Sequence, residues 1–247
     1  MNLFQSAFCG LLMCFFLIFC QFHSAPHAQR IDAHLFDAFW IWGDIKSAPY
    51  LKNAKELYIL QGEMQWNNQH SRAIFSAQGV NVLSIPHQKV WLVYRNHHLK
   101  WSKAEYHQIL IRIKQWEQQG NQIQGIQIDF DSKTKNIKEY ALFLQKLRTQ
   151  LPKQYQLSIT GLLDWTNVSN PETLSLLRNQ IDELVIQTYQ GTTTIANYQS
   201  YLKKITTMKI PYKVGYVQNG HWEKPFIQKN PYFKGNVVFL LRSGSRN

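Results

Sequence analysis

The sequence predicts an α/β protein with a single (β/α)8, TIM-like barrel, and three observations support this fold class. Apolar stretches of strand length alternate with amphipathic stretches of helix length along the chain, a pattern typical of parallel strands joined by helices. The strand-like stretches number roughly eight, which favours a closed barrel over an open doubly wound sheet. No glycine-rich phosphate-binding fingerprint follows the first of them, which disfavours a nucleotide-binding sheet.

Residues 1–28 are predicted to be a signal peptide, and residues 29–247 one barrel domain. The leader has no Lys, Arg, Asp or Glu, and Ala7–Phe22 is almost continuously apolar, which is short for a membrane span and typical of a secretory leader. Because the leader lacks the usual basic residue, an uncleaved anchor is the alternative. All three cysteines lie here, and Cys20 could instead carry a lipid. We expect an exported protein, periplasmic or secreted, that meets a membrane only through its N-terminus.

The chain is strongly basic, with a formal net charge of +12. Such a charge is consistent with solvated helix faces, or with attraction to anionic surfaces or polysaccharides outside the cytoplasm. The export signal and the absence of a recognisable basic motif disfavour nucleic acid as a partner.

In the first half of the domain, three strand-like stretches precede the first clear helix. Ser102 and Glu105 have the spacing of a capping box, and apolar residues recur at helical spacing from Tyr106 to Trp116. The sequence therefore predicts a helix that ends at Gly120. The other elements expected here are strands at Asp37–Trp42, Leu57–Glu63 and Val90–Arg95, a short helix at Lys52–Glu56, and either a strand or a connector at Val80–Ile85.

The second half alternates more regularly. Pro152 ends one amphipathic helix, and Pro171 suits the first turn of another. The strands are expected at Gln124–Asp131, Gln156–Gly161, Glu183–Tyr189, Tyr212–Val217 and Asn236–Leu241, with helices at Ile137–Leu147, Pro171–Asn179 and Ala196–Thr207.

The stretch Gln124–Ser132 is the most informative, because polar and apolar residues alternate along it. Successive side chains of a strand point to opposite faces, so Gln127, Asp129 and Asp131 should share one face. Residues two apart are separated by roughly 6.5–7 Å along a strand, so two carboxyl groups can converge on one small ligand.

Polar and aromatic residues gather at the predicted carboxyl ends of the strands, where barrels of this kind bind ligands. Aromatic faces stack on sugar rings, while carboxylates and amides bond the hydroxyls, so a carbohydrate is the expected partner. The adjacent His97 and His98 lack an evident third ligand, so neither a metal nor another cofactor is predicted. The residues expected to contact the sugar are Glu63, Gln127, Asp164, Gln187, Tyr189, Trp222 and Arg95. For Arg95 the simpler interpretation is that it pairs with one of the acids.

The same inventory could hydrolyse a glycosidic bond, with Asp131 as proton donor and Asp129 as its electrostatic partner. Two nearby carboxylates resist ionising together, which raises one pKa. Trp165 and Trp222 lie in polar stretches and are the expected sugar platforms. Trp40, Trp42 and Trp91 are expected to pack in the core.

Gly125–Asp131 resembles the strand-four motif of chitinase-like (family 18) glycoside hydrolases, which ends in a catalytic Glu. By this resemblance Asp131 takes the position of the acid, and Asp129 that of the Asp that assists the substrate's acetamido group. Gln187–Gln190 resembles the strand-six segment of that family, whose Tyr lines the site. Leu60–Glu63, Gln127–Ser132, Gln187–Gly191 and Gly215–Trp222 also resemble a bacterial family of exported barrels known as a domain of unknown function.

The chain departs from the chitinase-like pattern at several positions. Gln124 and Gln127 stand where that motif has Asp, Gln190 replaces another Asp, and Asp131 is one methylene shorter than Glu. The resemblance therefore implies either a glycoside hydrolase or a barrel that has lost hydrolysis and binds a glycan or a partner protein. Glu63 could supply a longer carboxyl group to the same site.

Overall fold

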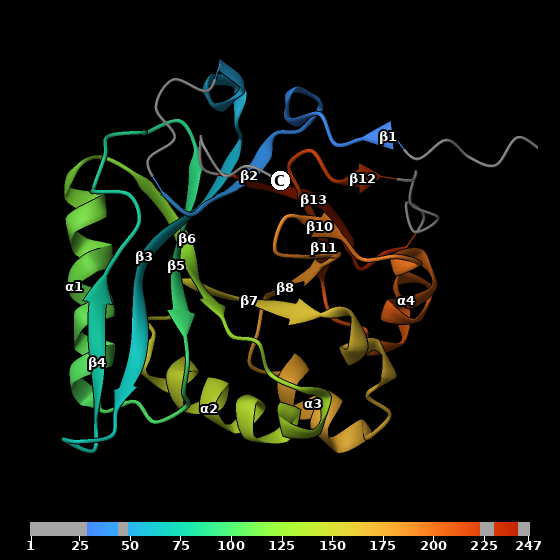
Figure 1. The fold of residues 1–247 in the computed structure, drawn as a ribbon. Helices are drawn as coiled ribbons and strands as arrows, with labels where there is room; N and C mark the ends of the chain where they lie inside the picture. The colour runs from blue at the N-terminus through green and yellow to red at the C-terminus, as the bar shows by residue number, and fades with distance from the viewer. Residues whose placement is uncertain (1–28, 44–48, 223–229, 242–247) are drawn as a thin grey trace, which may run out of the picture.

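Eight parallel strands close into a ring in the computed structural model, which describes residues 29–43, 49–222 and 230–241 (Figure 1). The strands pair in the order β2–β13–β11–β8–β7–β6–β5–β3, and β3 pairs again with β2. The predicted single (β/α)8, TIM-like barrel is therefore confirmed, while the predicted leader lies outside the described residues. The ring strands are β2 (Ala38–Ile41), β3 (Glu56–Asn67), β5 (Lys89–Asn96), β6 (Gln122–Asp129), β7 (Gln156–Leu162), β8 (Glu183–Gln187), β11 (Tyr212–Val217) and β13 (Phe233–Leu240).

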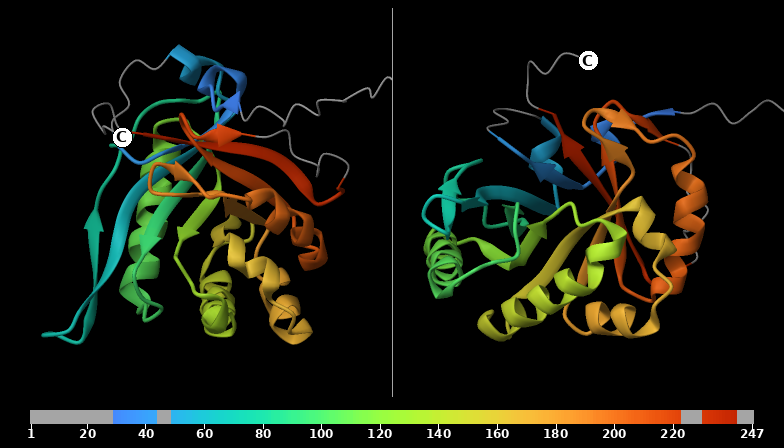
Figure 2. Two further views of the ribbon diagram at one scale, coloured as in Figure 1. Left: turned by 45° about the vertical axis from the view of Figure 1, so that its right-hand side comes forward. Right: turned by 60° about the horizontal axis from the view of Figure 1, so that its bottom comes forward.

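Four α-helices connect the strands from β5 to β11 and follow one another around the outside of the ring (Figure 2). The first begins at the predicted capping box: Ser102 accepts a hydrogen bond from the Ala104 N–H at 3.2 Å, and Glu105 accepts one from the Ser102 N–H at 2.6 Å. Within the described parts of the chain, no helix is long and apolar enough to cross a membrane. The helices are α1 (Lys103–Gln118), α2 (Ile137–Gln150), α3 (Pro171–Arg178) and α4 (Tyr198–Ile205).

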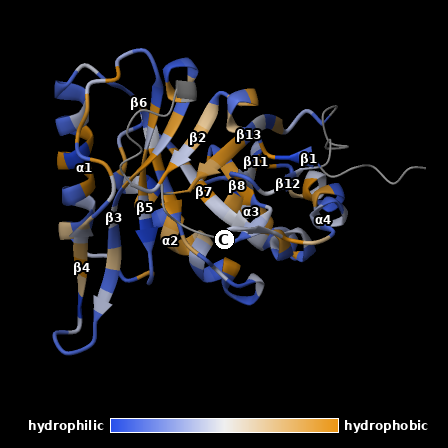
Figure 3. Cartoon of the chain, turned by 45° about the horizontal axis from the view of Figure 1, so that its top comes forward, coloured by the Kyte–Doolittle hydropathy of each residue, from blue (hydrophilic) through white to orange (hydrophobic). Residues whose placement is uncertain are grey.

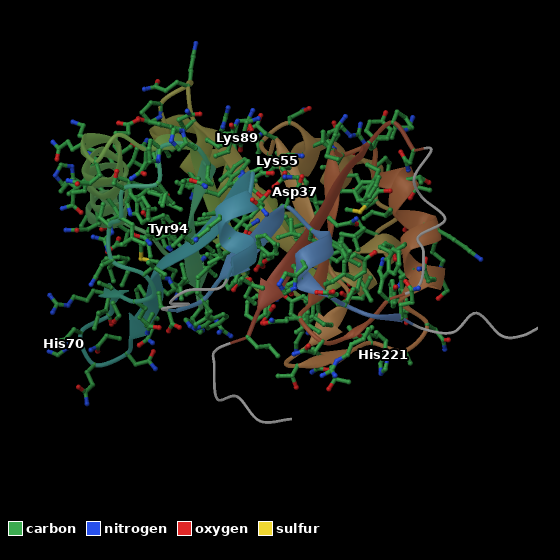
Figure 4. All side chains as sticks on the ribbon, turned by 90° about the horizontal axis from the view of Figure 1, so that it is seen from above. Asp37, Lys55, His70, Lys89, Tyr94 and His221 are labelled. Atoms are coloured by element: carbon green, nitrogen blue, oxygen red, sulfur yellow. The ribbon has the colours of Figure 1, made fainter. Side chains whose placement is uncertain are left out.

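The connections early in the barrel differ from the prediction. The short helix is a 3-10 turn at Pro49–Asn53, and Glu56 already begins β3. Between β3 and β5 the chain forms a hairpin, in which β4 (Arg72–Ala77) pairs antiparallel with the outer part of β3. His70 lies at its tip, far from the ring (Figure 4). The stretch Val80–Ile85 is a connector.

Side-chain parity divides the interior into two cores. Ile126 and Ile128 belong to the core between strands and helices, whereas Trp40 and Tyr58 belong to a smaller core inside the ring. Figure 3 shows the matching pattern on α1, whose apolar residues face the strands. On β6 the isoleucines face the helices, while Gln127, which accepts a hydrogen bond from Trp40, and Asp129, which lines the cavity, share the inner face, as their common parity predicts.

Paired charges fill the ring near the amino ends of the strands. Inside, Lys213 pairs with Glu56 and, at 3.1 Å, with Glu183. At the outer edge Asp37 binds Lys55 at 2.7 Å, beside the start of β5 (Figure 4). Because charged groups and their partners occupy this end, a ligand has access to the interior from the carboxyl ends of the strands.

Candidate functional site

A cavity of about 700 Å³ opens at the carboxyl ends of the strands, within the usual size range of small-molecule sites. Three carboxyl groups line it, from Asp129, Asp131 and Asp164. Two cations, Arg95 and Lys133, share the wall with them. The aromatic residues of the wall are Trp40, Trp42, Tyr189, Tyr201 and Phe239.

Asp129 at the end of β6 and Asp131 in the turn that follows it lie at different depths. A β-carbon added to Gly125 would lie 2.0 Å from the carbonyl oxygen of Gln156, so only glycine lets β6 approach β7 here. Beyond the strand, the Ser132 N–H donates to the Phe130 carbonyl at 2.7 Å, a tight turn with Asp131 at its centre. Asp131 is consequently exposed at the cavity rim, whereas Asp129 is only 7% exposed below it.

The buried carboxyl of Asp129 holds a proton more tightly than usual. Burial, helped by the negative charge of Asp131, raises the pKa of Asp129 to about 6, against the opposing effects of Thr160, Arg95 and His97. Thr160 donates its hydroxyl hydrogen to Asp129 Oδ1 at 2.8 Å, which favours the ionised form. Asp129 therefore exchanges its proton close to neutral pH, as residues that handle protons in catalysis often do.

Gln127 lies below the cavity and does not line it. Its side chain is fully buried, accepts a hydrogen bond from the Trp40 indole at 2.6 Å and donates one to Ser158 at 2.9 Å. Since both ends of the amide have protein partners, Gln127 supports the aromatic floor at Trp40.

Asp164 offers the cavity an unpaired oxygen. Its Oδ2 accepts a hydrogen bond from the Thr134 hydroxyl, while its Oδ1 is buried and has no hydrogen-bond partner among the described residues. A buried acceptor without a partner is costly. A ligand hydroxyl or N–H could satisfy this oxygen.

Aromatic rings form one continuous surface on the side of the cavity made by β2, β13 and the residues just after β8. Ring centroids lie 5.4 Å apart for Trp40 and Trp42, 4.8 Å for Trp40 and Phe239, and 5.4 Å for Tyr189 and Phe239. Trp42 packs against the inner core, as expected, but its half-buried ring also lines the cavity. A sugar ring could stack on this surface.

Trp165 and Trp91 are both buried and do not line the cavity. Trp165 is not a platform: it is fully buried, and its indole donates to the Ser132 carbonyl at 2.7 Å, which fixes the turn after Asp131. The core position of Trp91 is confirmed, with 1% exposure and a stacked contact to Tyr58.

Besides Gln127, two further residues expected to contact the sugar lie outside the cavity wall. Glu63 sits on β3 where β4 joins it, and its Oε2 lies 3.4 Å from His97 Nε2. Trp222 belongs to the short strand β12 (His221–Trp222), packs against the main core and buries its indole nitrogen. Of the remaining predicted residues, the cavity brings together Asp129, Asp131, Asp164, Gln187, Tyr189 and Arg95.

Thr160, Lys133 and Phe239 are cavity or supporting residues that the sequence interpretation missed. Strand parity could have identified two of them. Thr160 shares its parity with Ser158, another polar residue of the buried strand β7, and Phe239 shares its parity with Val237, which faces the inside of the ring. Lys133 follows the acidic strand by a few residues, in a loop whose path parity does not predict.

Residues 97–197 match the family described as "Domain of unknown function (DUF3142)". The match contains the acidic end of β6 and the Gln187–Gly191 stretch, and leaves out two of the other stretches that suggested such a family, Leu60–Glu63 and Gly215–Trp222. No curated protein matches the sequence.

Several solved structures are similar to this chain, among them two spore proteins. The spore cortex-lytic enzyme SleL of Bacillus cereus aligns with a TM-score of 0.50 and 19% identity, over 78% of this chain and 53% of that one. The chain thus spans about half the length of SleL. The chitinase domain of the spore coat protein CotE of Clostridium difficile aligns with a TM-score of 0.47 and 11% identity, over 80% and 69% of the two chains. The similarity to SleL supports the barrel fold.

Proposed function

We propose that this protein is an exported, glycoside-hydrolase-like barrel that acts on a polysaccharide or cell-envelope glycan. Asp131 is the proton donor, and Asp129 is its electrostatic partner. The observation that carries the proposal is the pair of acids. The exposed carboxyl of Asp131 lies at the rim of a cavity large enough for a sugar ring, above the buried carboxyl of Asp129, whose pKa is raised to about 6.

Glycoside hydrolysis needs one carboxylic acid that protonates the leaving oxygen and a second group that stabilises positive charge on the sugar. Asp131 reaches the cavity and can approach the leaving oxygen. The charge of Asp131 helps burial to raise the pKa of Asp129 to about 6, so the two carboxyl groups interact. Asp129 can therefore hold or release a proton beside Asp131 near pH 6.

The sugar is held by groups around this pair. Burial raises the pKa of Tyr189 well above its usual range, so its hydroxyl stays a neutral hydrogen-bond donor. Asp164 contributes its unpaired oxygen, and Gln187 an amide. Trp42 and Phe239 provide the stacking surface in place of Trp165 and Trp222. The barrel fold shared with a spore cortex-lytic enzyme is consistent with a glycan as substrate.

The second candidate is a barrel that binds a glycan or a partner without hydrolysing it. Gln127 favours this alternative, because an amide with both ends bonded stands below Asp129, where the chitinase-like motif has an acid. An amide at this position cannot pass a proton to Asp129.

The test is the release of reducing ends from a panel of envelope and matrix glycans, by the wild type and by Asp131→Asn. Hydrolysis that Asp131→Asn abolishes supports the enzyme. Glu172→Gln serves as the matched control, since Glu172 is exposed on α3 and does not line the cavity. Saturable binding without turnover by the wild type supports the second candidate. If no glycan is bound or cleaved, the proposal is wrong.

A further inference from the structure

The cavity wall contains two cations that form no direct ion pair with its acids among the described residues, although the charge of Arg95 acts on Asp129 and opposes the rise of its pKa. Arg95 and Lys133 both line the cavity. Within the described parts of the chain, neither forms an ion pair or a hydrogen bond with an acidic residue. Cations that served only to balance Asp129, Asp131 and Asp164 would be expected to pair with them.

Among the described residues, Arg95 contacts an aromatic ring and forms no direct ion pair. It stands opposite Asp129 in the ladder between β5 and β6, yet Asp129 takes its hydrogen bond from Thr160. The guanidinium carbon lies instead 4.5 Å from the centroid of the Trp42 ring. A guanidinium stacked on an aromatic face keeps its N–H donors at its edge, in the fork geometry that fits a carboxylate. Trp42 therefore holds Arg95 ready for an anionic group in the cavity.

Lys133 extends the positive charge to the rim. It is exposed, two residues after Asp131, and the next residue, Thr134, bonds the cavity residue Asp164. The same segment continues with Lys135 and, in the first turn of α2, Lys138, both of them exposed. A chain of net charge +12 adds a general attraction for anions.

We propose that the glycan of this cavity carries carboxylate groups, as a uronic acid polymer does, and that Arg95 and Lys133 bind one of them beside the sugar held by the aromatic surface. This inference rests on the proposed function, because it names the substrate class of the same cavity. The acids then act on the glycosidic bond while the cations select the anionic sugar.

The test compares galacturonate, glucuronate and mannuronate oligosaccharides as free acids and as methyl esters, with neutral oligosaccharides of the same length, in calorimetric titrations. We expect the free acid to bind at least tenfold more tightly than its ester. Arg95→Gln and Lys133→Gln should each weaken binding of the acid about tenfold and leave the ester unaffected. Arg95→Lys should recover only part of the loss, because it restores the charge without the fork.

Lys114→Gln is the matched control, since Lys114 is exposed on α1 and does not line the cavity; its binding should equal that of the wild type. Neutral oligosaccharides or esters that bind as tightly as the acids would overturn the inference and leave the proposed function standing. Equal binding of the acid by Arg95→Gln and by the wild type would have the same consequence. A protein that binds none of these sugars, and cleaves none of the wider glycan panel, would overturn both proposals.

Discussion

Replacing Asp129 by Asn should stabilise the protein at neutral pH, although it is expected to impair function. Burial raises the pKa of this carboxyl from 3.8 to about 6, so the folded state holds the proton more tightly than the unfolded chain does. The ionised group therefore destabilises the fold at pH values above about 6. Because one pKa unit corresponds to about 1.36 kcal/mol, the cost is about 3 kcal/mol. Asn carries no charge, and its side-chain oxygen can still accept the hydrogen bond from Thr160.

The assay is urea unfolding of the wild type and Asp129→Asn at pH 8, 6 and 4. The free energy of unfolding of the variant should exceed that of the wild type by about 3 kcal/mol at pH 8. The difference should shrink as the pH falls through 6, and disappear below about pH 4, where both states bind the proton. Glu172→Gln should stay within about 0.5 kcal/mol of the wild type, as surface changes usually do. A variant less stable than the wild type at pH 8, or a difference independent of pH, would show that burial of this charge does not destabilise the fold.

Three further predictions concern neighbouring groups. Thr160→Val removes a hydrogen bond, worth about 1.5 kcal/mol, that favours the ionised carboxylate of Asp129. The pKa of Asp129 should therefore rise from about 6 to about 7 in a carboxyl ¹³C NMR titration. An unchanged pKa would contradict this prediction. Lys213→Met leaves the buried Glu183 and the half-buried Glu56 without their cation, so urea unfolding should show a loss of about 3–5 kcal/mol. A loss below about 1 kcal/mol would argue against this account. Trp42→Ala removes a stacking surface worth about 0.5–1.5 kcal/mol, so glycan affinity in a calorimetric titration should fall about three- to tenfold; unchanged affinity would mean that the sugar lies elsewhere.

Strand parity allowed much of the ring and its acidic pair to be predicted. A strand has only two faces, so the alternation in β6 indicates which side chains share the inside once the ring closes. Parity does not predict their different depths: Asp129 ends β6 and is buried, whereas Asp131 lies in the turn beyond the strand and is exposed. The same rule, applied to β7 and β13, would have identified Thr160 and Phe239.

The loops could not be predicted in this way, because their direction depends on tertiary contacts. Trp165 lies in a polar stretch and looked exposed, but the 3-10 turn at Leu163–Asn167 buries its ring against the loop that follows β6. Glu63 does not share the parity of Tyr58 and Leu60, which face the inside of the ring. A bulge between Leu60 and Gly62 shifts the register and brings Glu63 opposite Arg95, and β3 then continues into a hairpin that places it beside His97. Neither the length of that strand nor the presence of β4 is evident from local periodicity.

A crystal structure of the protein with an oligosaccharide bound would decide whether the cavity is a glycan site. We predict a sugar ring in the cavity of about 700 Å³, stacked on Trp42 or Phe239, with Asp131 within hydrogen-bond distance of a glycosidic oxygen. A sugar bound elsewhere on the protein, or a cavity that stays without sugar at a saturating concentration, would contradict this prediction.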